Sequence, residues 1–319
     1  MDMSAIIKAL GRGKSGSRDL TFDEAHFAMT SILDGSIHDV QLGAFLMLLR
    51  VKEETAIEIA GMVSACHDYL DKNESMIVDV NWPAYAGKKR QPSWYILAAK
   101  LLSQNNISIF MHGGGQHTPN RQYAESVCEF LELPIASSLE QAATQLKEHN
   151  FSYVALQTIN LTLSNLIDLK FVLGLRSPVN TLVRHITPFN TRLTLQSMFH
   201  PAYQALHSHT AKLLNQPNNI VLKGDSGEFE VRPDSETRIA IQGFSPVDTN
   251  FLPKSLKQRA VRPEQPSLDA LKNLWDGNSH NQYGEHATID TAAIVYAKVE
   301  SIAYEQAKCI VTGWWHERA

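Results

Sequence analysis

The chain has only three cysteines in 319 residues, Cys66, Cys128 and Cys309, and no two of them form a C-x-x-C pair. Such scarcity is typical of idle thiols in a reducing compartment. No run of about eighteen apolar residues occurs, so no membrane-spanning helix is expected. The N-terminus lacks the apolar segment of a secretory signal, and the expected location is therefore the cytoplasm.

The sequence also lacks the common signatures of catalysis and metal binding. No G-x-G-x-x-G or G-x-x-x-x-G-K-[ST] loop, H-E-x-x-H pair or Ser/His/Asp order stands out. The 13 histidines are scattered, and the group His200, His207 and His209 has no cysteine or carboxylate close by in the sequence. A zinc site is therefore not expected, and no resident cofactor is predicted.

What the sequence does contain is the composition of an ordinary globular protein, with 44% hydrophobic and 19% charged residues. The net charge of -4 excludes a molecule coated all over with positive charge, but it leaves room for a local basic groove. At this length the chain is expected to divide into two lobes.

Residues 1–75 are expected to form a small all-helical domain. Thr21 and Glu24 predict a capping box at the start of one helix, which Gly35 ends. Residues 39–51 are strongly apolar, and residues 55–70 are amphipathic at helical spacing. A segment this apolar packs against something else, either a second subunit or the other lobe of the same chain.

From Val78 the pattern changes to alternating strands and helices, which predicts an α/β domain. Residues 78–115 form one βαβ unit in this interpretation, with Ser93 as the N-cap of its helix. In open α/β sheets, ligands lie outside the carboxyl ends of the strands. The turn 85–91 and the loop 112–115 should therefore lie side by side in one crevice.

Two glycine-containing turns in that crevice could bind phosphate through their backbone N–H groups. They are Ala86-Gly87-Lys88-Lys89-Arg90 and His112-Gly113-Gly114-Gly115. Each is also explained as a tight turn that the sheet requires. Arg176 and Arg184 either lie over the same crevice or belong to a solvated hinge. The N-terminal arm with Arg12, Lys14 and Arg18 either seeks phosphate or is simply solvated.

A second pair of strands is expected at residues 219–222 and 228–232, around the turn 224–227. Its carboxylates, Asp225, Glu228 and Glu230, could hold Mg²⁺ together with substrate phosphates. Since Glu228 and Glu230 alternate along a strand, they should point to opposite faces, which favours an exposed hairpin. The last helix is expected at residues 288–312.

Five segments near the N-terminus carry a family resemblance: Leu20-Thr21-Phe22-Asp23-Glu24-Ala25, Asp34-Gly35, Gln41-Leu42-Gly43-Ala44-Phe45-Leu46, Arg50-Val51-Lys52 and Glu58-Ile59-Ala60-Gly61. Together they resemble the helical domain of anthranilate phosphoribosyltransferases and class II nucleoside phosphorylases, and a weaker likeness covers nearly the whole chain. The resemblance implies a helical lobe completed by residues 160–188, an α/β lobe of mostly parallel strands over residues 76–319, and a homodimer through the helical lobe.

The positions that the resemblance assigns to ligands are altered. Where the family grips the pyrophosphate of phosphoribosyl pyrophosphate with Gly-Thr-Gly-Gly-Asp, this chain has Pro83-Ala84-Tyr85-Ala86-Gly87 followed by Lys88-Lys89-Arg90. The family's Lys-His-Gly-Asn-Arg loop is replaced by Met111-His112-Gly113-Gly114-Gly115, which has neither cation. Of the family's magnesium-binding Asp-Glu pair, the chain keeps at most one carboxylate, Glu228.

Phosphoribosyl transfer depends on the electrostatic placement of a charged donor and its metal, so little or no anthranilate phosphoribosyltransferase activity is expected. The pattern instead resembles the TrpD-like, YbiB-type subgroup, which implies binding of DNA or RNA without sequence preference. Residues 78–121 contain five cations against one carboxylate, a local charge of +4 that is consistent with this interpretation.

The expected phosphate-binding residues are Lys88, Lys89, Arg90, Arg176 and Arg184, supported by Arg12, Lys14 and Arg18. Tyr85 and Trp94 are either stacking platforms for bases or core residues. The rival expectation is a phosphoribosyl- or glycosyltransferase with another acceptor. That enzyme would use residues 88–90 for the donor's phosphates and Glu228 for Mg²⁺.

Overall fold

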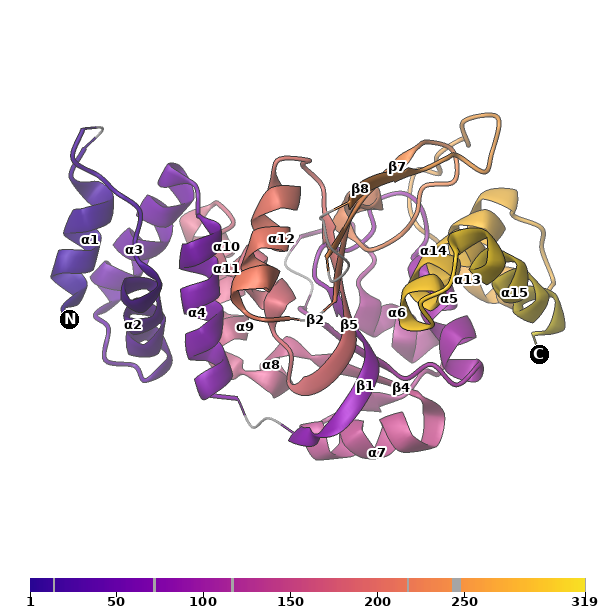
Figure 1. Cartoon of the computed structure of the whole chain (residues 1–319), viewed down its shortest axis with the longest axis horizontal. Coiled ribbons are helices and arrows are strands. Elements are labelled where there is room, and N and C mark those ends of the chain that lie inside the picture. Colours follow the sequence, from indigo (N-terminus) through magenta and orange to yellow (C-terminus); the bar gives the residue numbers. More distant parts are fainter. Residues whose placement is uncertain (14, 71–72, 116–117, 217, 243–247, 319) are drawn as a thin grey trace.

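The computed structural model describes every residue except 14, 71–72, 116–117, 217, 243–247 and 319. Four helices gather at one end of the molecule, and a sheet with its covering helices forms the rest (Figure 1). The predicted fold class is therefore confirmed: a small helical N-terminal part and a larger α/β part with a mostly parallel sheet.

The N-terminal helices have the local signals that the sequence indicates. The Glu24 N–H donates to Thr21 Oγ1, and the Thr21 N–H donates to Glu24 Oε2, which is the predicted capping box. Residues 156–189 contribute to the same apolar core as these helices, while the domain boundary at residue 75 stays a prediction. The helices are α1 (Met3–Gly11), α2 (Phe22–Leu33), α3 (Asp39–Lys52) and α4 (Ala56–Asp68).

The strands form one sheet in the order β3-β4-β2-β1-β5-β6-β7-β8. All neighbouring pairs from β3 to β6 are parallel, whereas β7 runs antiparallel to both β6 and β8. The carboxyl ends of the parallel strands consequently meet at one edge. The strands are β1 (Asn73–Ala84), β2 (Ile109–Gly113), β3 (Ile135–Ala136), β4 (Phe151–Ala155), β5 (Phe189–Met198), β6 (Asn219–Lys223), β7 (Thr237–Gln242) and β8 (Asp248–Leu252).

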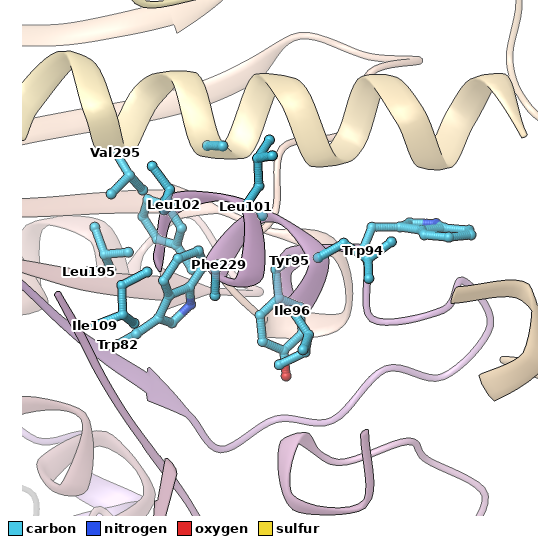
Figure 2. Packing of buried hydrophobic residues seen from close by; sticks show 14 of the residues in the cluster. Trp82, Trp94, Tyr95, Ile96, Leu101, Leu102, Ile109, Leu195, Phe229 and Val295 are labelled. Atoms are coloured by element: carbon cyan, nitrogen blue, oxygen red, sulfur yellow. The ribbon is translucent and has the colours of Figure 1, made fainter. Parts of the chain in front are cut away.

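Helices cover both faces of the sheet, because alternate strand residues point to opposite sides. Trp82 and Ile109 belong to the apolar cluster that also contains Leu101 of α5 and Val295 of α14 (Figure 2). Phe110 faces the other way, toward the helical lobe. The first face carries α5 (Trp94–Gln104), α6 (Ala124–Phe130), α13 (Leu268–Trp275), α14 (Gln282–Val299) and α15 (Tyr304–Glu317). The second carries α7 (Leu139–His149), α8 (Leu156–Ile159), α9 (Leu161–Asp168), α10 (Lys170–Leu173), α11 (Val179–Leu182) and α12 (Tyr203–Leu213).

Two local predictions are wrong, and the predicted N-cap Ser93 is confirmed in its position alone. The expected helix 288–312 is broken into α14 and α15, with Ser301 at a positive φ of 55° between them. Residues 228–232 form no strand and instead continue an irregular loop. Ser93 makes no capping hydrogen bond, because its hydroxyl donates to Gln122 Oε1. Among the described residues, no helix combines the length and the apolar character needed to cross a membrane.

Candidate functional site

The carboxyl ends of β1 and β2 lie next to each other, and this is where the predicted crevice should be. Ala84 pairs with Gly113 in the parallel register, and the Tyr85 hydroxyl lies 2.7 Å from His112 Nδ1. A Cβ on Gly113 would lie 2.4 Å from the Ala84 carbonyl oxygen, so the two strand ends approach as closely as glycine permits. The expectation that the turn after β1 and the loop after β2 lie side by side is confirmed.

Tyr85 and Trp94 are core residues and not stacking platforms. Tyr85 is buried against His112, with the two rings edge to face at 5.4 Å, and Trp94 is buried at the start of α5. Burial lowers the pKa of His112 to about 3, with a smaller contribution from the Arg184 charge. His112 is therefore neutral at physiological pH and supplies no positive charge to the crevice.

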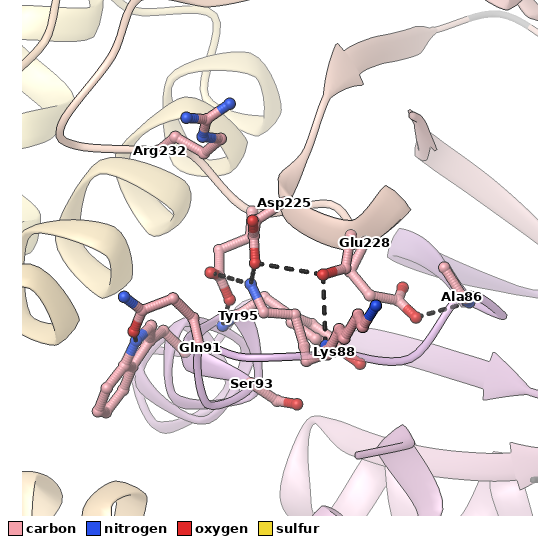
Figure 3. A network of polar contacts seen from close by, with 12 residues as sticks. Ala86, Lys88, Gln91, Ser93, Tyr95, Asp225, Glu228 and Arg232 are labelled. Carbon is pink, nitrogen blue, oxygen red and sulfur yellow. Dashed lines mark hydrogen bonds and ion pairs between the residues drawn. The ribbon is translucent and has the colours of Figure 1, made fainter. Parts of the chain in front are cut away.

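Lys88 points into the protein, so the prediction that it presents its charge outward is wrong. The ammonium group of this fully buried side chain lies 2.7 Å from Asp225 Oδ2 and 2.5 Å from Glu230 Oε1 (Figure 3). The Lys88 backbone pairs with that of Gln122, which holds the turn in this orientation. Since two carboxylates already surround this ammonium, Lys88 is unavailable to a phosphate.

The Glu228 carboxylate accepts hydrogen bonds from the backbone N–H groups of the turn that was expected to bind phosphate. Its Oε1 accepts hydrogen bonds from the N–H of Ala86 at 2.7 Å and of Gly87 at 2.5 Å, and the side chain is fully buried (Figure 3). Gly87 has a positive φ of 67°, which turns its N–H toward the same oxygen as that of Ala86. A carboxylate of the protein itself thus sits in the anion-binding position.

Glu230 is a second buried carboxylate that accepts a hydrogen bond from a backbone N–H group. Its Oε2 accepts a hydrogen bond of 3.0 Å from the Tyr95 N–H in the first turn of α5, while its Oε1 receives Lys88. The expected exposed hairpin is wrong, because residues 224–230 fold inward as a loop and bring both glutamates to the turn. Burial raises the pKa of Glu228, and it raises that of Glu230 to about 7 despite the opposing charge of Lys88.

The carboxylates near the turn do not fit a magnesium site as they stand. Asp225 and Glu230 share Lys88, and Glu228 is held by backbone N–H groups. Within the part of the chain that the structure describes, no group of three or more His, Cys, Asp or Glu side chains is arranged to hold a metal ion. Mg²⁺ bound through Glu228 would require this loop to rearrange.

Arg121 orients the turn and was not singled out from the sequence beyond its charge. Its Nη1 donates to the carbonyl oxygens of Ala86 and Gly87, both at 2.9 Å. Because the carbonyls face Arg121, the turn presents its N–H groups to Glu228 on the other side. No sequence signal marked this role, since it depends on a contact between segments 35 residues apart.

Of the two alternatives for Arg176 and Arg184, the structure supports a position at the crevice over a solvated hinge. They line a cavity of about 220 Å³ between the helical lobe and the sheet edge, together with Tyr85 and Ala86. Arg184 is buried and donates to the Gly227 carbonyl at 3.4 Å, and Arg176 is half-buried beside Thr118. Sequence reasoning did not assign three further polar residues of this lining to the crevice: Arg50, Glu54 and Tyr203.

The remaining predicted cations differ in their surroundings. Lys89 and Arg90 are exposed, and neither makes an ion pair with another described residue. Arg18 is exposed but bound to Glu24 at 2.6 Å. Arg12 follows α1, which lies at the opposite end of the molecule from α5, and is exposed (Figure 1). Lys14 lies outside the described residues.

Comparisons with known proteins identify a family model and several relatives that are similar to this chain. A family model described as the helical bundle domain of a glycosyl transferase family matches residues 4–69. The chain is 28% identical to the uncharacterized protein YbiB of Escherichia coli K12, over 73% of this chain and 74% of YbiB. It is 25% identical to an anthranilate phosphoribosyltransferase of Actinobacillus pleuropneumoniae, over 86% of this chain and 83% of that enzyme.

Solved structures show the same architecture. The anthranilate phosphoribosyltransferase of Saccharomyces cerevisiae in complex with PRPP and Mg superposes with a TM-score of 0.79. The superposition covers 99% of this chain and 93% of the yeast chain, at 16% sequence identity. At this identity the likeness shows a shared fold.

Proposed function

We propose that this chain, which is similar to the TrpD-like, YbiB-type branch of the anthranilate phosphoribosyltransferase-like family, is a cytoplasmic protein that binds the phosphate backbone of nucleic acids without sequence preference. Its scaffold is similar to that of a phosphoribosyltransferase, but a side chain of the protein itself occupies the position where the donor's pyrophosphate would bind. The observation that carries the proposal is the Glu228 carboxylate on the N–H groups of Ala86 and Gly87.

Glu228 disfavours a small phosphate donor at this site. A pyrophosphate group would compete with the carboxylate for the same two N–H groups, and the displaced carboxylate would remain buried without its donors, which is costly. Lys88 cannot compensate, because Asp225 and Glu230 already neutralise it. The N–H groups of Ala86 and Gly87 are therefore not available to the phosphates of a phosphoribosyl donor.

Lys89 and Arg90 favour a long polyanion. Both follow the closed turn directly, both are exposed, and neither is paired with a described carboxylate. Exposed cations of this kind bind nucleic acid through its phosphates and release condensed counterions, without reading the base sequence. Lys89 and Arg90 therefore replace Lys88 as the phosphate-binding residues of the turn.

We also propose that the protein is a homodimer through its helical lobe. Large apolar side chains stand exposed there, with Val40 and Val51 on α3 and Phe171 and Val172 on α10. Side chains this apolar are commonly covered by a partner when they cluster on one lobe. A dimer would also present two copies of the Lys89 and Arg90 pair to one nucleic-acid chain.

Fluorescence anisotropy with a labelled oligonucleotide tests the binding proposal. The double variant Lys89→Ala/Arg90→Ala should bind more weakly than the wild type, and by a similar factor for unrelated sequences, because it loses phosphate contacts. The matched control is Lys147→Ala/Lys212→Ala, which removes the same charge from the ends of α7 and α12. Equal weakening in both variants would contradict a specific role for the turn.

Calorimetry separates this proposal from the transferase alternative. Titration of the wild type with phosphoribosyl pyrophosphate and Mg²⁺ should give no binding heat, because Glu228 occupies the N–H groups that the donor needs. Heat that appears in the wild type and disappears in Glu228→Ala would instead support a transferase that holds its donor through this carboxylate.

A further inference from the structure

A strongly basic segment outside the site described above borders a hollow of about 900 Å³. Residues 253–263, Pro-Lys-Ser-Leu-Lys-Gln-Arg-Ala-Val-Arg-Pro, contain four cations and no acidic residue. We call this segment the basic strap. It follows β8 and leads toward α13, and its four cations are all exposed: Lys254, Lys257, Arg259 and Arg262.

The strap is irregular in backbone but anchored at several points. Leu256 is buried, and its N–H donates to the Pro233 carbonyl at 2.8 Å. Ser255 Oγ donates to Asp290 Oδ2 at 2.5 Å, which ties the strap to α14. The cations are therefore carried on a backbone that the protein itself holds in place, which lowers the entropy cost of binding through them.

The hollow beside the strap connects it to the turn after β1. It has a volume of about 900 Å³ and is lined by Gln91, Pro92, Lys257, Arg259, Asn281 and Tyr283. Gln91 and Pro92 directly follow Lys89 and Arg90 in the chain. The strap and residues 91–92 thus line the same hollow, and the exposed Lys89 and Arg90 directly precede those two residues in the chain.

Two carboxylates near the strap are buried, whereas its four cations are exposed, as is Glu264 directly after the strap. Asp290 is buried and receives Lys308 at 2.7 Å as well as Ser255. Asp234 is also buried beneath the strap, where its Oδ2 accepts the Ala260 N–H at 3.4 Å. Four exposed cations against the exposed carboxylate of Glu264 leave the strap positively charged, so it attracts anions.

The charge of Arg262 on the strap acts on Asp225, which lies beside the turn after β1. Together with Lys88 and Arg232 it lowers the pKa of Asp225, against the raising effect of burial, which places Arg262 within electrostatic reach of that cluster.

We propose that the strap and the turn 89–92 together form a groove for single-stranded nucleic acid, with Lys257 and Arg259 on one wall and Lys89 and Arg90 on the other. This inference rests on the proposed function and assigns it a second set of residues. Three exposed amides also line the hollow, Gln258, Gln265 and Gln282, and they can hydrogen-bond to base edges that only an unpaired strand exposes.

Anisotropy titrations over a salt series test the groove with a labelled oligothymidylate. The variant Lys257→Ala/Arg259→Ala should bind more weakly, and the slope of log Kobs against log salt should become shallower by about 1.4, which is about 0.7 for each lost contact to a single strand. Circular dichroism should be unchanged, because both side chains are exposed. The Lys147→Ala/Lys212→Ala variant again controls for net charge.

The outcomes separate the two proposals. If the wild type binds no oligonucleotide at any salt concentration, the proposed function fails, and the groove fails with it. If the Lys89→Ala/Arg90→Ala variant loses affinity while Lys257→Ala/Arg259→Ala binds with unchanged affinity and slope, the strap is no wall of the groove and only this inference is overturned. Tighter binding of a duplex than of its separated strands would overturn the assignment to single strands.

Discussion

Glu228 determines, as a single residue, what the turn after β1 is able to bind. A backbone turn with converging N–H groups attracts any suitably placed anion, and here the nearest anion is a side chain of the same protein. The family resemblance predicts this carboxylate to be a metal ligand. The structure instead shows it bound to the backbone of the turn after β1.

Replacing Glu228 by alanine should uncover this anion site. An unpaired buried polar group costs about 1–3 kcal/mol, so the free energy of unfolding should fall by at least that amount. Inorganic pyrophosphate can then supply the missing acceptor, and millimolar pyrophosphate should raise the Tm of Glu228→Ala more than that of the wild type. Glu228→Gln is the control, because its amide oxygen still accepts an N–H. Equal responses of Glu228→Ala and wild type would contradict the account.

His112 should make stability depend on pH. Its pKa is about 3 in the folded protein and near 6.5 in the unfolded chain, so the unfolded state takes up the proton first as the pH falls. The stabilisation is complete above about pH 6.5 and is lost toward lower pH, at roughly 1 kcal/mol per pH unit. Glu230, whose pKa is raised to about 7, acts in the opposite direction, while His185 acts in the same one.

The variant His112→Asn isolates this contribution. Asparagine Oδ1 can replace Nδ1 as the acceptor for the Tyr85 hydroxyl, but it does not titrate. Urea unfolding at several pH values between about 5 and 7 should therefore show a weaker loss of stability on acidification than in the wild type. An unchanged slope would mean that His112 is not buried in its neutral form.

At the scale of elements, close packing of α2 on α4 depends on Gly61. A Cβ at this position would lie 2.3 Å from the Phe22 carbonyl oxygen, so the two helices would have to separate. Gly61→Ala should lower the free energy of unfolding by about 1–3 kcal/mol through overpacking. Gly313→Ala on α15 meets nothing within 4 Å and should instead be neutral or stabilising through helix propensity. Denaturant melts of both variants check the contrast.

The elements that the sequence predicts well are those that local signals determine. The Thr21 capping box, the βαβ unit and the meeting of β1 and β2 at their carboxyl ends depend on spacing within short segments. The burial of Lys88 and Glu228 could not be predicted in this way, because their contacts join segments about 140 residues apart. Without those contacts, a lysine in a turn is expected to be exposed.

At the scale of the whole molecule, the exposed apolar residues of the helical lobe predict a dimer. Light scattering should give twice the mass of one chain, 35.6 kDa, for the wild type. Val40→Asp/Phe171→Asp should give the mass of a single chain, because a buried unpaired carboxylate at an interface is costly. Val261→Asp on the strap introduces the same chemistry at a residue that is 94% exposed and should leave the dimer intact. A wild-type monomer would contradict the proposed assembly.

Net charge alone would place this protein among those that nucleic acid repels, yet its charges are unevenly distributed. The total of -4 includes the buried carboxylates Glu228, Glu230 and Asp290 as well as the buried cations Lys88 and Arg184. Lys89, Arg90 and the cations of the basic strap remain outside. A polyanion that approaches this side of the α/β lobe therefore meets a positive surface.

The salt dependence of oligonucleotide binding by the wild-type protein tests the central claim most directly. If the scaffold has exchanged a phosphoribosyl donor for a phosphate backbone, log Kobs should fall linearly with log salt. The slope should be about -1.4 or steeper for two or more contacts to a single strand, and it should not depend on base sequence. Binding that is absent, or that is indifferent to salt, would contradict the account.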